Sequence, residues 1–139
     1  MKISIKILGN PTAKQSFRFS VIAGHVHKYQ SSKVKNESNN MRAQIVDQLP
    51  DGWQPLDGPL AVSGMVFVFP WLSSHSKKKR ALGGCFWRDT KPDIDNLMKA
   101  VLDASQGILF NKDSQIACLE SVSKVYGDVP RIEFTLVKI

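Results

Sequence analysis

The sequence predicts one domain of the α/β or α+β class, built as a single mixed β-sheet flanked by two main helices. Three observations predict it. Both ends of the chain carry segments with strand periodicity, two long segments between them have helical periodicity, and the chain has 139 residues of which 42% are hydrophobic. A chain of this length buries one sizeable core and is short for two domains, so we expect residues 1–139 to form a single domain.

The first half of the chain predicts two strand regions and a helix. Residues 1–8 alternate between apolar and polar side chains, as a half-buried strand does. Residues 17–29 indicate a hairpin that turns near Ala23 and Gly24. An imperfect apolar stripe predicts a helix over residues 32–49, and the turn-rich segment PDGWQPLDGP follows it.

The second half predicts a central strand, a long loop, a helix and two closing strands. Residues 60–69 form a near-continuous apolar run, which is typical of a central strand covered on both faces. Residues 72–92 predict an irregular loop, and loops of that length are usually functional or disordered. A helix is expected from Asp95 to a C-cap at Gly107, followed by strands at about 116–126 and 131–137.

No segment of the sequence predicts contact with a membrane. No apolar run approaches the roughly 20 residues of a membrane span, and the alternating start MKISIKIL lacks the continuous apolar stretch of a signal peptide. We therefore expect a cytoplasmic protein.

Charge is distributed unevenly along a chain whose formal net charge is +7. Residues 1–50 carry eight Lys or Arg against two acids, and residues 71–92 carry six against one. Residues 93–139 carry five bases against seven acids. This segregation suits a site in which acids hold cations while the surrounding bases hold the phosphates of a polyanionic partner.

Asp93 and Asp95, in the segment KPDIDNLMKAVLDA, stand where a helix is expected to begin. Pro92 favours a helix boundary at this point. A cap needs only one suitable residue, and Thr90, Asp93 or Asp95 could each serve. Two close carboxylates repel unless a cation neutralises them, and Mg²⁺ binds carboxylates together with water and phosphate oxygens.

A third acid follows in GILFNKDSQI, where Asp113 lies between the helix and the next strand. We expect Asp93, Asp95 and Asp113 to be catalytic ligands of one or two Mg²⁺ ions, or of Mn²⁺. Two ions ~3.5 to 4 Å apart stabilise both the attacking and the leaving oxygen of a phosphodiester displacement. Lys99 is expected to stabilise the scissile phosphate as a fixed charge. The competing interpretation is a solvated helix face on which Asp95, Lys99 and Asp103 form ordinary ion pairs.

Basic residues upstream of these acids are candidates for binding DNA phosphates, which provides largely sequence-independent affinity. The competing interpretation of the KKKR segment is a solvated mobile loop. The expected DNA contacts are Lys14, Arg18, Lys77, Lys78, Lys79, Arg80, Arg88 and Lys91.

The segments KPDIDNLMKAVLDAS and GILFNKDSQI together resemble the signature of the RusA family of Holliday-junction resolvases, the crossover junction endodeoxyribonucleases of bacteria and their phages or prophages. The resemblance is strongest over residues 91–116. It implies a mixed sheet flanked by helices, a homodimer, and Mg²⁺-dependent cleavage of four-way junctions in recombination and repair. It also implies that Asp93, Asp95 and Asp113 are the catalytic carboxylates, that Lys99 is the helix lysine, and that Asp103 matches an acidic position of the family helix.

The leading prediction is therefore an endodeoxyribonuclease that resolves Holliday junctions or other branched DNA by attack of a metal-activated water on a phosphodiester. One alternative is a non-catalytic basic DNA-binding module whose acids only cap and pair, for which divalent ions are irrelevant. Another is a metal phosphohydrolase of a small phosphorylated substrate, for which the excess of basic residues has no purpose.

Overall fold

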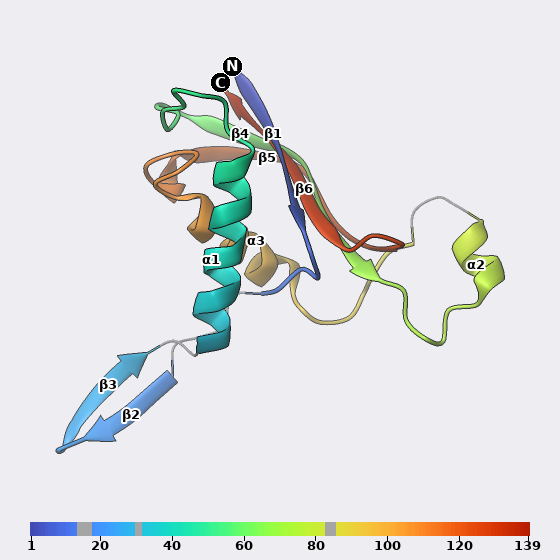
Figure 1. Cartoon of the computed structure of the whole chain (residues 1–139), viewed down its shortest axis with the longest axis horizontal. Helices are drawn as coiled ribbons and strands as arrows, with labels where there is room; N and C mark the ends of the chain where they lie inside the picture. Colours follow the sequence, from blue (N-terminus) through green and yellow to red (C-terminus); the bar gives the residue numbers. More distant parts are fainter. Residues whose placement is uncertain (14–17, 30–31, 83–85) are drawn as a thin grey trace.

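A mixed four-stranded sheet is the centre of the computed structural model, which describes residues 1–13, 18–29, 32–82 and 86–139 (Figure 1). The strand order is β1–β6–β4–β5, in which β4 and β5 are parallel and the other two pairs are antiparallel. These strands are β1 (Lys2–Leu8), β4 (Leu60–Pro70), β5 (Ile116–Gly127) and β6 (Arg131–Lys138). The predicted mixed sheet is confirmed, and the arrangement belongs to the α+β class.

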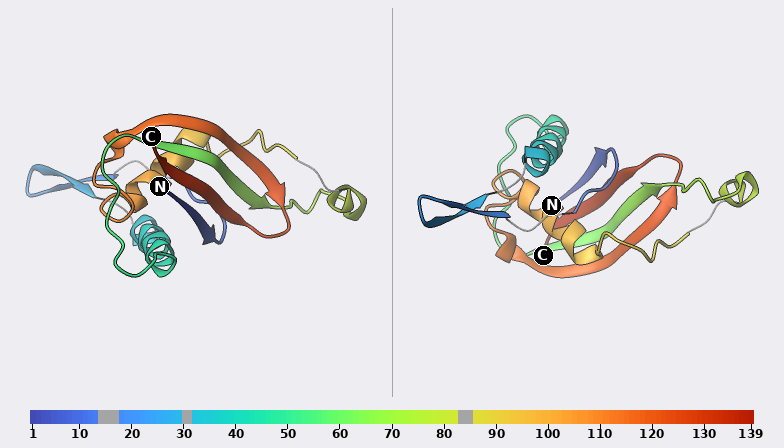
Figure 2. Two further views of the ribbon diagram at one scale, coloured as in Figure 1. Left: turned by 90° about the horizontal axis from the view of Figure 1, so that it is seen from above. Right: turned by 90° about the horizontal axis from the view of Figure 1, so that it is seen from below.

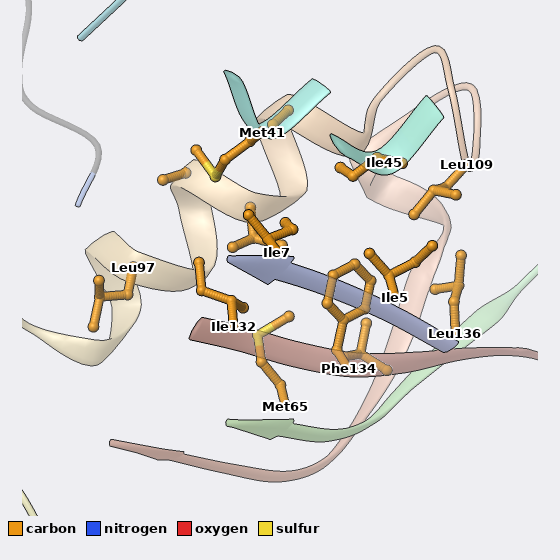
Figure 3. Packing of buried hydrophobic residues seen from close by; sticks show 14 of the residues in the cluster. Ile5, Ile7, Met41, Ile45, Met65, Leu97, Leu109, Ile132, Phe134 and Leu136 are labelled. Carbon is orange, nitrogen blue, oxygen red and sulfur yellow. The ribbon is translucent and has the colours of Figure 1, made fainter. Parts of the chain in front are cut away.

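Both long helices, α1 (Ser32–Asp47) and α3 (Ile94–Ser105), pack on the same face of this sheet (Figure 2). Figure 3 shows the resulting core, in which Ile5 and Ile7 of β1 meet Met41 and Ile45 of α1. Leu97 of α3 has no exposed surface and belongs to the same core. The two predicted main helices are thus found, and the core lies between them and one side of the sheet.

The end of the first long helix and the surroundings of β4 differ from the prediction. The helix expected to reach Leu49 ends at Asp47. The amides of Gln48 and Leu49 donate to carbonyls three residues back, as in a 3-10 turn, and Pro50 follows. Strand β4 is an inner strand as predicted, with residues buried on both of its faces. The long helices cover only one face, however, and the other carries an ion-pair cluster in which Glu133 lies 3.1 Å from Arg131.

Two elements extend away from the sheet at opposite ends of the long axis (Figures 1 and 2). One is the predicted hairpin, β2 (Arg18–Ile22) and β3 (His25–Tyr29), which turns at Ala23 and Gly24. Both turn residues have positive φ, 51° and 79°, as the hairpin twist favours.

The other is the short helix α2 (Lys77–Ala81), which lies within the segment that we predicted to be an irregular loop. Ser76 caps this helix by accepting a hydrogen bond from the Lys79 amide at 3.1 Å, and lysine and arginine are good helix formers. Within the described part of the chain, no helix has the length and apolar character needed to cross a membrane.

Candidate active site

Asp93 and Asp95 lie exposed at the N-terminal end of α3. Asp93 occupies the N-cap position with an extended backbone, but its carboxylate makes no capping hydrogen bond with the residues that the structure describes. The Oδ1 atom of Asp95 accepts one hydrogen bond, from the Asn96 amide at 2.9 Å. Capping therefore does not occupy the carboxylate of Asp93, and the helix N-terminus favours negative charge at this place.

Two cationic side chains hold the backbone that leads into Asp93. Lys124 Nζ donates to the carbonyl oxygens of Thr90 and Pro92 at 2.7 and 2.8 Å. Arg88 Nε donates to the carbonyl oxygen of Lys91 at 3.2 Å. Three consecutive carbonyls before Asp93 are thus bound by charged donors, which fix the place where the helix begins.

Arg88, predicted to contact DNA, is half-buried in this arrangement. Its guanidinium lies 4.3 Å from the centre of the Phe69 ring and 5.4 Å from that of Tyr126. Its backbone amide donates to the Lys124 carbonyl at 3.0 Å, so the segment from Phe86 to Arg88 lies along the second half of β5. The contacts of Arg88 in this chain are those of a residue that positions the loop.

Asp113 begins the short 3-10 helix η1 (Asp113–Gln115), which lies beyond the C-terminal end of α3 (Figure 2). Its backbone amide donates to Gln106 Oε1 at 3.1 Å, and Gln106, not the predicted Gly107, is the C-cap of α3. Arg42 of α1 secures this end, because its Nη1 atom donates to the carbonyls of Ala104 and Gln106 at 3.1 and 3.0 Å. The Asp113 carboxylate itself is exposed.

The length of α3 therefore separates Asp113 from Asp93 and Asp95. The helix has 12 residues, which corresponds to roughly 18 Å along its axis, whereas carboxylates that share one Mg²⁺ each lie about 2 Å from it. Among the residues that the structure describes, no three His, Cys, Asp or Glu side chains are close enough to hold one metal ion. One chain places Asp93 and Asp95 at one end of α3 and Asp113 at the other.

Lys99 lies exposed on α3, one turn after Asp95. The structure describes both residues and contains no ion pair between them. Asp103 is half-buried one turn further along. The interpretation of Asp95 and Lys99 as an ordinary intrahelical pair finds no support here.

The predicted basic contacts that the structure describes do not form one cluster. Those from Lys77 to Arg80 lie on α2 and are exposed, and so is Lys91 beside the acidic site. Lys14 lies outside the described residues. Arg18 belongs to the backbone of β2, but its side chain is not among those described. The four residues from Lys77 to Arg80 are therefore the predicted DNA contacts that lie together on one element, α2.

An aromatic cluster connects α2 to the sheet. His75 and Trp71 make an edge contact with ring centres 5.3 Å apart, and His75 lies 4.7 Å from Tyr126. The Nδ1 atom of His75 accepts a hydrogen bond from the Leu72 amide at 2.9 Å. Desolvation lowers the pKa of His75 below its ordinary value, and the nearby positive charges of Lys79 and Arg80 lower it further.

Two residues that support the site were not predicted from the sequence. Lys124 lies on the helix-facing side of β5 between Val122 and Tyr126, and a lysine at an inward position of an alternating strand is the signal that would have identified it. Gln115 holds η1 in place, since its Nε2 atom donates to the carbonyls of Leu56 and Gly58 at 3.0 Å. The side-chain amide of Gln115 thus holds the loop before β5, and no periodic pattern in the sequence predicts this contact.

Comparison with known proteins identifies the family of the chain. The family model of endodeoxyribonuclease RusA matches residues 9–137. The chain is 31% identical over 140 residues to an uncharacterized protein, YqaN, of Bacillus subtilis strain 168, covering 99% of this chain and 96% of that protein. It is also 28% identical to the crossover junction endodeoxyribonuclease rusA of Lactococcus phage r1t, with coverage of 93% and 91%. The chain therefore belongs to the RusA family of endodeoxyribonucleases, which are metal-dependent hydrolases of phosphodiester bonds in DNA.

Proposed function

We propose that this protein is a homodimeric, Mg²⁺-dependent resolvase of Holliday junctions that acts in recombination and repair in the cytoplasm, with residues 1–139 as its single domain. One observation carries the proposal. Asp93 and Asp95 are exposed carboxylates on a helix end that Lys124 and Arg88 hold in place, and capping does not use the Asp93 side chain. The family match over residues 9–137 supports the same conclusion.

The donor atoms fit a hard divalent cation. Asp93, Asp95 and Asp113 offer exposed carboxylate oxygens, the ligand type that Mg²⁺ and Mn²⁺ prefer. When bound, a divalent ion would make a coordinated water more acidic and so supply the nucleophile. The aspartates would hold the ion, and Lys99 would stabilise the charge that develops on the scissile phosphate. The exposed bases of α2 bind the DNA backbone and contribute affinity.

The experiment compares nicking of a four-way junction, a flap and a plain duplex, each with and without Mg²⁺. We expect divalent-ion-dependent nicking of the junction. Asp95→Asn should retain junction binding and lose nicking, because the bases provide affinity and the carboxylates provide chemistry. Asp89→Asn is the matched control, since Asp89 is an exposed acid only four residues before Asp93. Normal nicking by Asp95→Asn contradicts the proposal.

The same experiment separates the competing functions. A basic DNA-binding module binds the junction without any metal-dependent cleavage. A phosphohydrolase of small substrates turns over a phosphomonoester and is indifferent to added junction DNA. Asp93 occupies the N-cap position, but its carboxylate makes no capping hydrogen bond with the described residues. This argues against the interpretation in which the acids only cap the helix.

A further inference from the structure

We propose that the hairpin β2–β3 is a wedge that recognises the branch point of the DNA by packing its apolar tip against the faces of bases exposed there. The inference rests on the proposed function and deepens it, because it names the element that distinguishes a junction from a continuous duplex. It starts from an apolar surface that the fold of the chain leaves uncovered.

The tip of the hairpin exposes a pair of valines. Val21 and Val26 lie directly opposite each other on the two strands and are 71% and 68% exposed. The turn residues between the strands, Ala23 and Gly24, are exposed as well and carry no polar side chain. Because burial of apolar surface is favourable, an apolar tip that the chain leaves in water indicates a partner that covers it.

The hairpin receives little support from the rest of the described chain. Its strands have five residues each and form a sheet of their own, separate from the four-stranded one. None of the hairpin residues whose side chains the structure describes belongs to the hydrophobic core. A two-stranded hairpin without a packed face is at best marginally stable in water. Contact with a partner would therefore also stabilise its conformation.

The charge around the hairpin favours nucleic acid as that partner. Residues 10–36 contain five Lys or Arg and no Asp or Glu. A second copy of the chain on the same tip would bring two such positive segments together, which the repulsion of like charges opposes. DNA carries phosphates on its outside and apolar base faces within, so it complements a basic element that has an apolar tip.

The hairpin and α2 lie on opposite sides of α3, which carries the acids. The two elements extend at opposite ends of the long axis of the molecule, and α3 lies between them (Figures 1 and 2). The exposed carboxylates Asp93 and Asp95 therefore lie between a basic helix and a hairpin from a basic segment. One branched substrate would contact α2 with a duplex arm and the hairpin with its branch point.

The dimensions of the hairpin suit this contact. A strand of five residues spans roughly 17 Å, whereas the grooves of DNA are only about 8 Å deep. The major groove is ~12 Å wide and admits a two-stranded ribbon. The tip of the hairpin can thus reach the bases while the other end of its strands stays at the level of the phosphates.

An apolar tip distinguishes branched from continuous DNA. Apolar side chains enter a base stack only by separating neighbouring bases, which costs free energy in a duplex. At a branch point the stack is already interrupted, so the same insertion costs less. Contacts to phosphates, in contrast, form with any DNA sequence or shape that presents a backbone. The valine pair therefore provides selectivity for the branch, and the basic residues provide affinity.

Replacing both tip valines with threonine tests the wedge. Threonine keeps the β-branched shape and the strand preference, and it replaces one methyl group with a hydroxyl. The Kd values for a four-way junction and for a duplex of the same length are measured in EDTA, without cleavage. In Val21→Thr/Val26→Thr we expect the preference for the junction, the duplex Kd divided by the junction Kd, to fall by roughly tenfold. The dependence of binding on salt should stay as in the wild type, because no charge changes.

Two further variants serve as controls. Val46→Thr/Val129→Thr changes two valines that are 53% and 54% exposed elsewhere on the molecule, and it should keep the preference for the junction. Val21→Ile/Val26→Ile keeps the apolar character of the tip and should also bind as the wild type does. A loss of preference in the isoleucine variant equal to that in the threonine variant would contradict an apolar contact.

A fluorescent adenine analogue that brightens when it loses its stacking neighbours reports the insertion itself. The wild type should brighten the analogue beside the branch point and not in the middle of an arm, whereas the threonine variant should brighten it at neither place. A threonine variant with the wild-type preference and signal, or a wild type that binds junction and duplex alike, overturns the wedge. A threonine variant that changes only the sedimentation of the free protein indicates a contact between proteins and overturns it too.

The binding measurements need no cleavage, so they separate the wedge from the proposed function. A wild type that prefers the junction and brightens the analogue, but does not nick with Mg²⁺, overturns the proposed nuclease and supports the wedge. A wild type that nicks the junction, with a threonine variant that keeps the full preference, overturns the wedge alone.

Discussion

Replacing Lys124 with methionine tests whether this lysine positions the acidic site. Met keeps the apolar part of the side chain and removes the donors to the Thr90 and Pro92 carbonyls. Hydrogen bonds from a charged group are worth about 1.5 to 3 kcal/mol each, and the Thr90 bond counts for less because it is exposed. We expect the free energy of unfolding to fall by about 2 to 3 kcal/mol and Tm to fall on the order of 10 °C.

The assay combines thermal and denaturant unfolding with junction nicking at a temperature where the variant is folded. Lys6→Met is the matched control, because Lys6 pairs with Glu133 at 3.4 Å on the exposed face of the sheet and such pairs contribute less than about 1 kcal/mol. Nicking should decrease in Lys124→Met and not in the control. If both variants unfold alike and nick at the wild-type rate, the two bonds do not position Asp93.

Three further predictions concern Lys99 on α3, the basic residues of α2, and His75 just before α2. Lys99→Met should keep the fold and Mn²⁺ binding while nicking slows by roughly 100-fold or more; an unchanged rate would make Lys99 an ordinary surface residue. Replacing Lys77, Lys78 and Lys79 with alanine should weaken binding of junction and duplex alike, and flatten the plot of log affinity against log salt by ~0.9 for each phosphate that the variant no longer neutralises; an unaltered slope contradicts α2 as a DNA-binding element. Because the pKa of His75 is lowered in the folded state, the unfolded chain binds more protons once pH falls below about 6.5, so stability decreases there. The denaturation midpoint should therefore depend less on pH in His75→Gln than in the wild type, and an unchanged dependence on pH contradicts this role of His75.

Predictions made from local patterns agreed with the structure where the pattern itself decides the conformation. The alternation of residues 1–8 and the apolar run of residues 60–69 became β1 and β4, because strand periodicity depends only on which side chains must be buried. The turn at Ala23 and Gly24 was found for a similarly local reason. Helix α2 was missed because its five residues span little more than one turn, too few to show a period.

The acidic site likewise has features that local sequence predicts and features that depend on packing. Their residue types and the position of Asp93 and Asp95 at a helix start follow from the segment around Pro92. The support from Lys124, more than thirty positions later, depends on which face of β5 meets α3. Local periodicity cannot reveal such a contact, because it is made by the packing of two elements.

Local patterns were enough to predict the strand and helix periods, the segregation of charge, and the acids and bases available for chemistry, since each of these depends on residues a few positions apart. The tertiary structure alone decided that both long helices share one face of the sheet and that α3 holds Asp113 away from Asp93. It also left the first half of β5 open as an edge. The physical reason is that these features depend on chain topology and on the length of a rigid helix, which act over distances that no local pattern encodes.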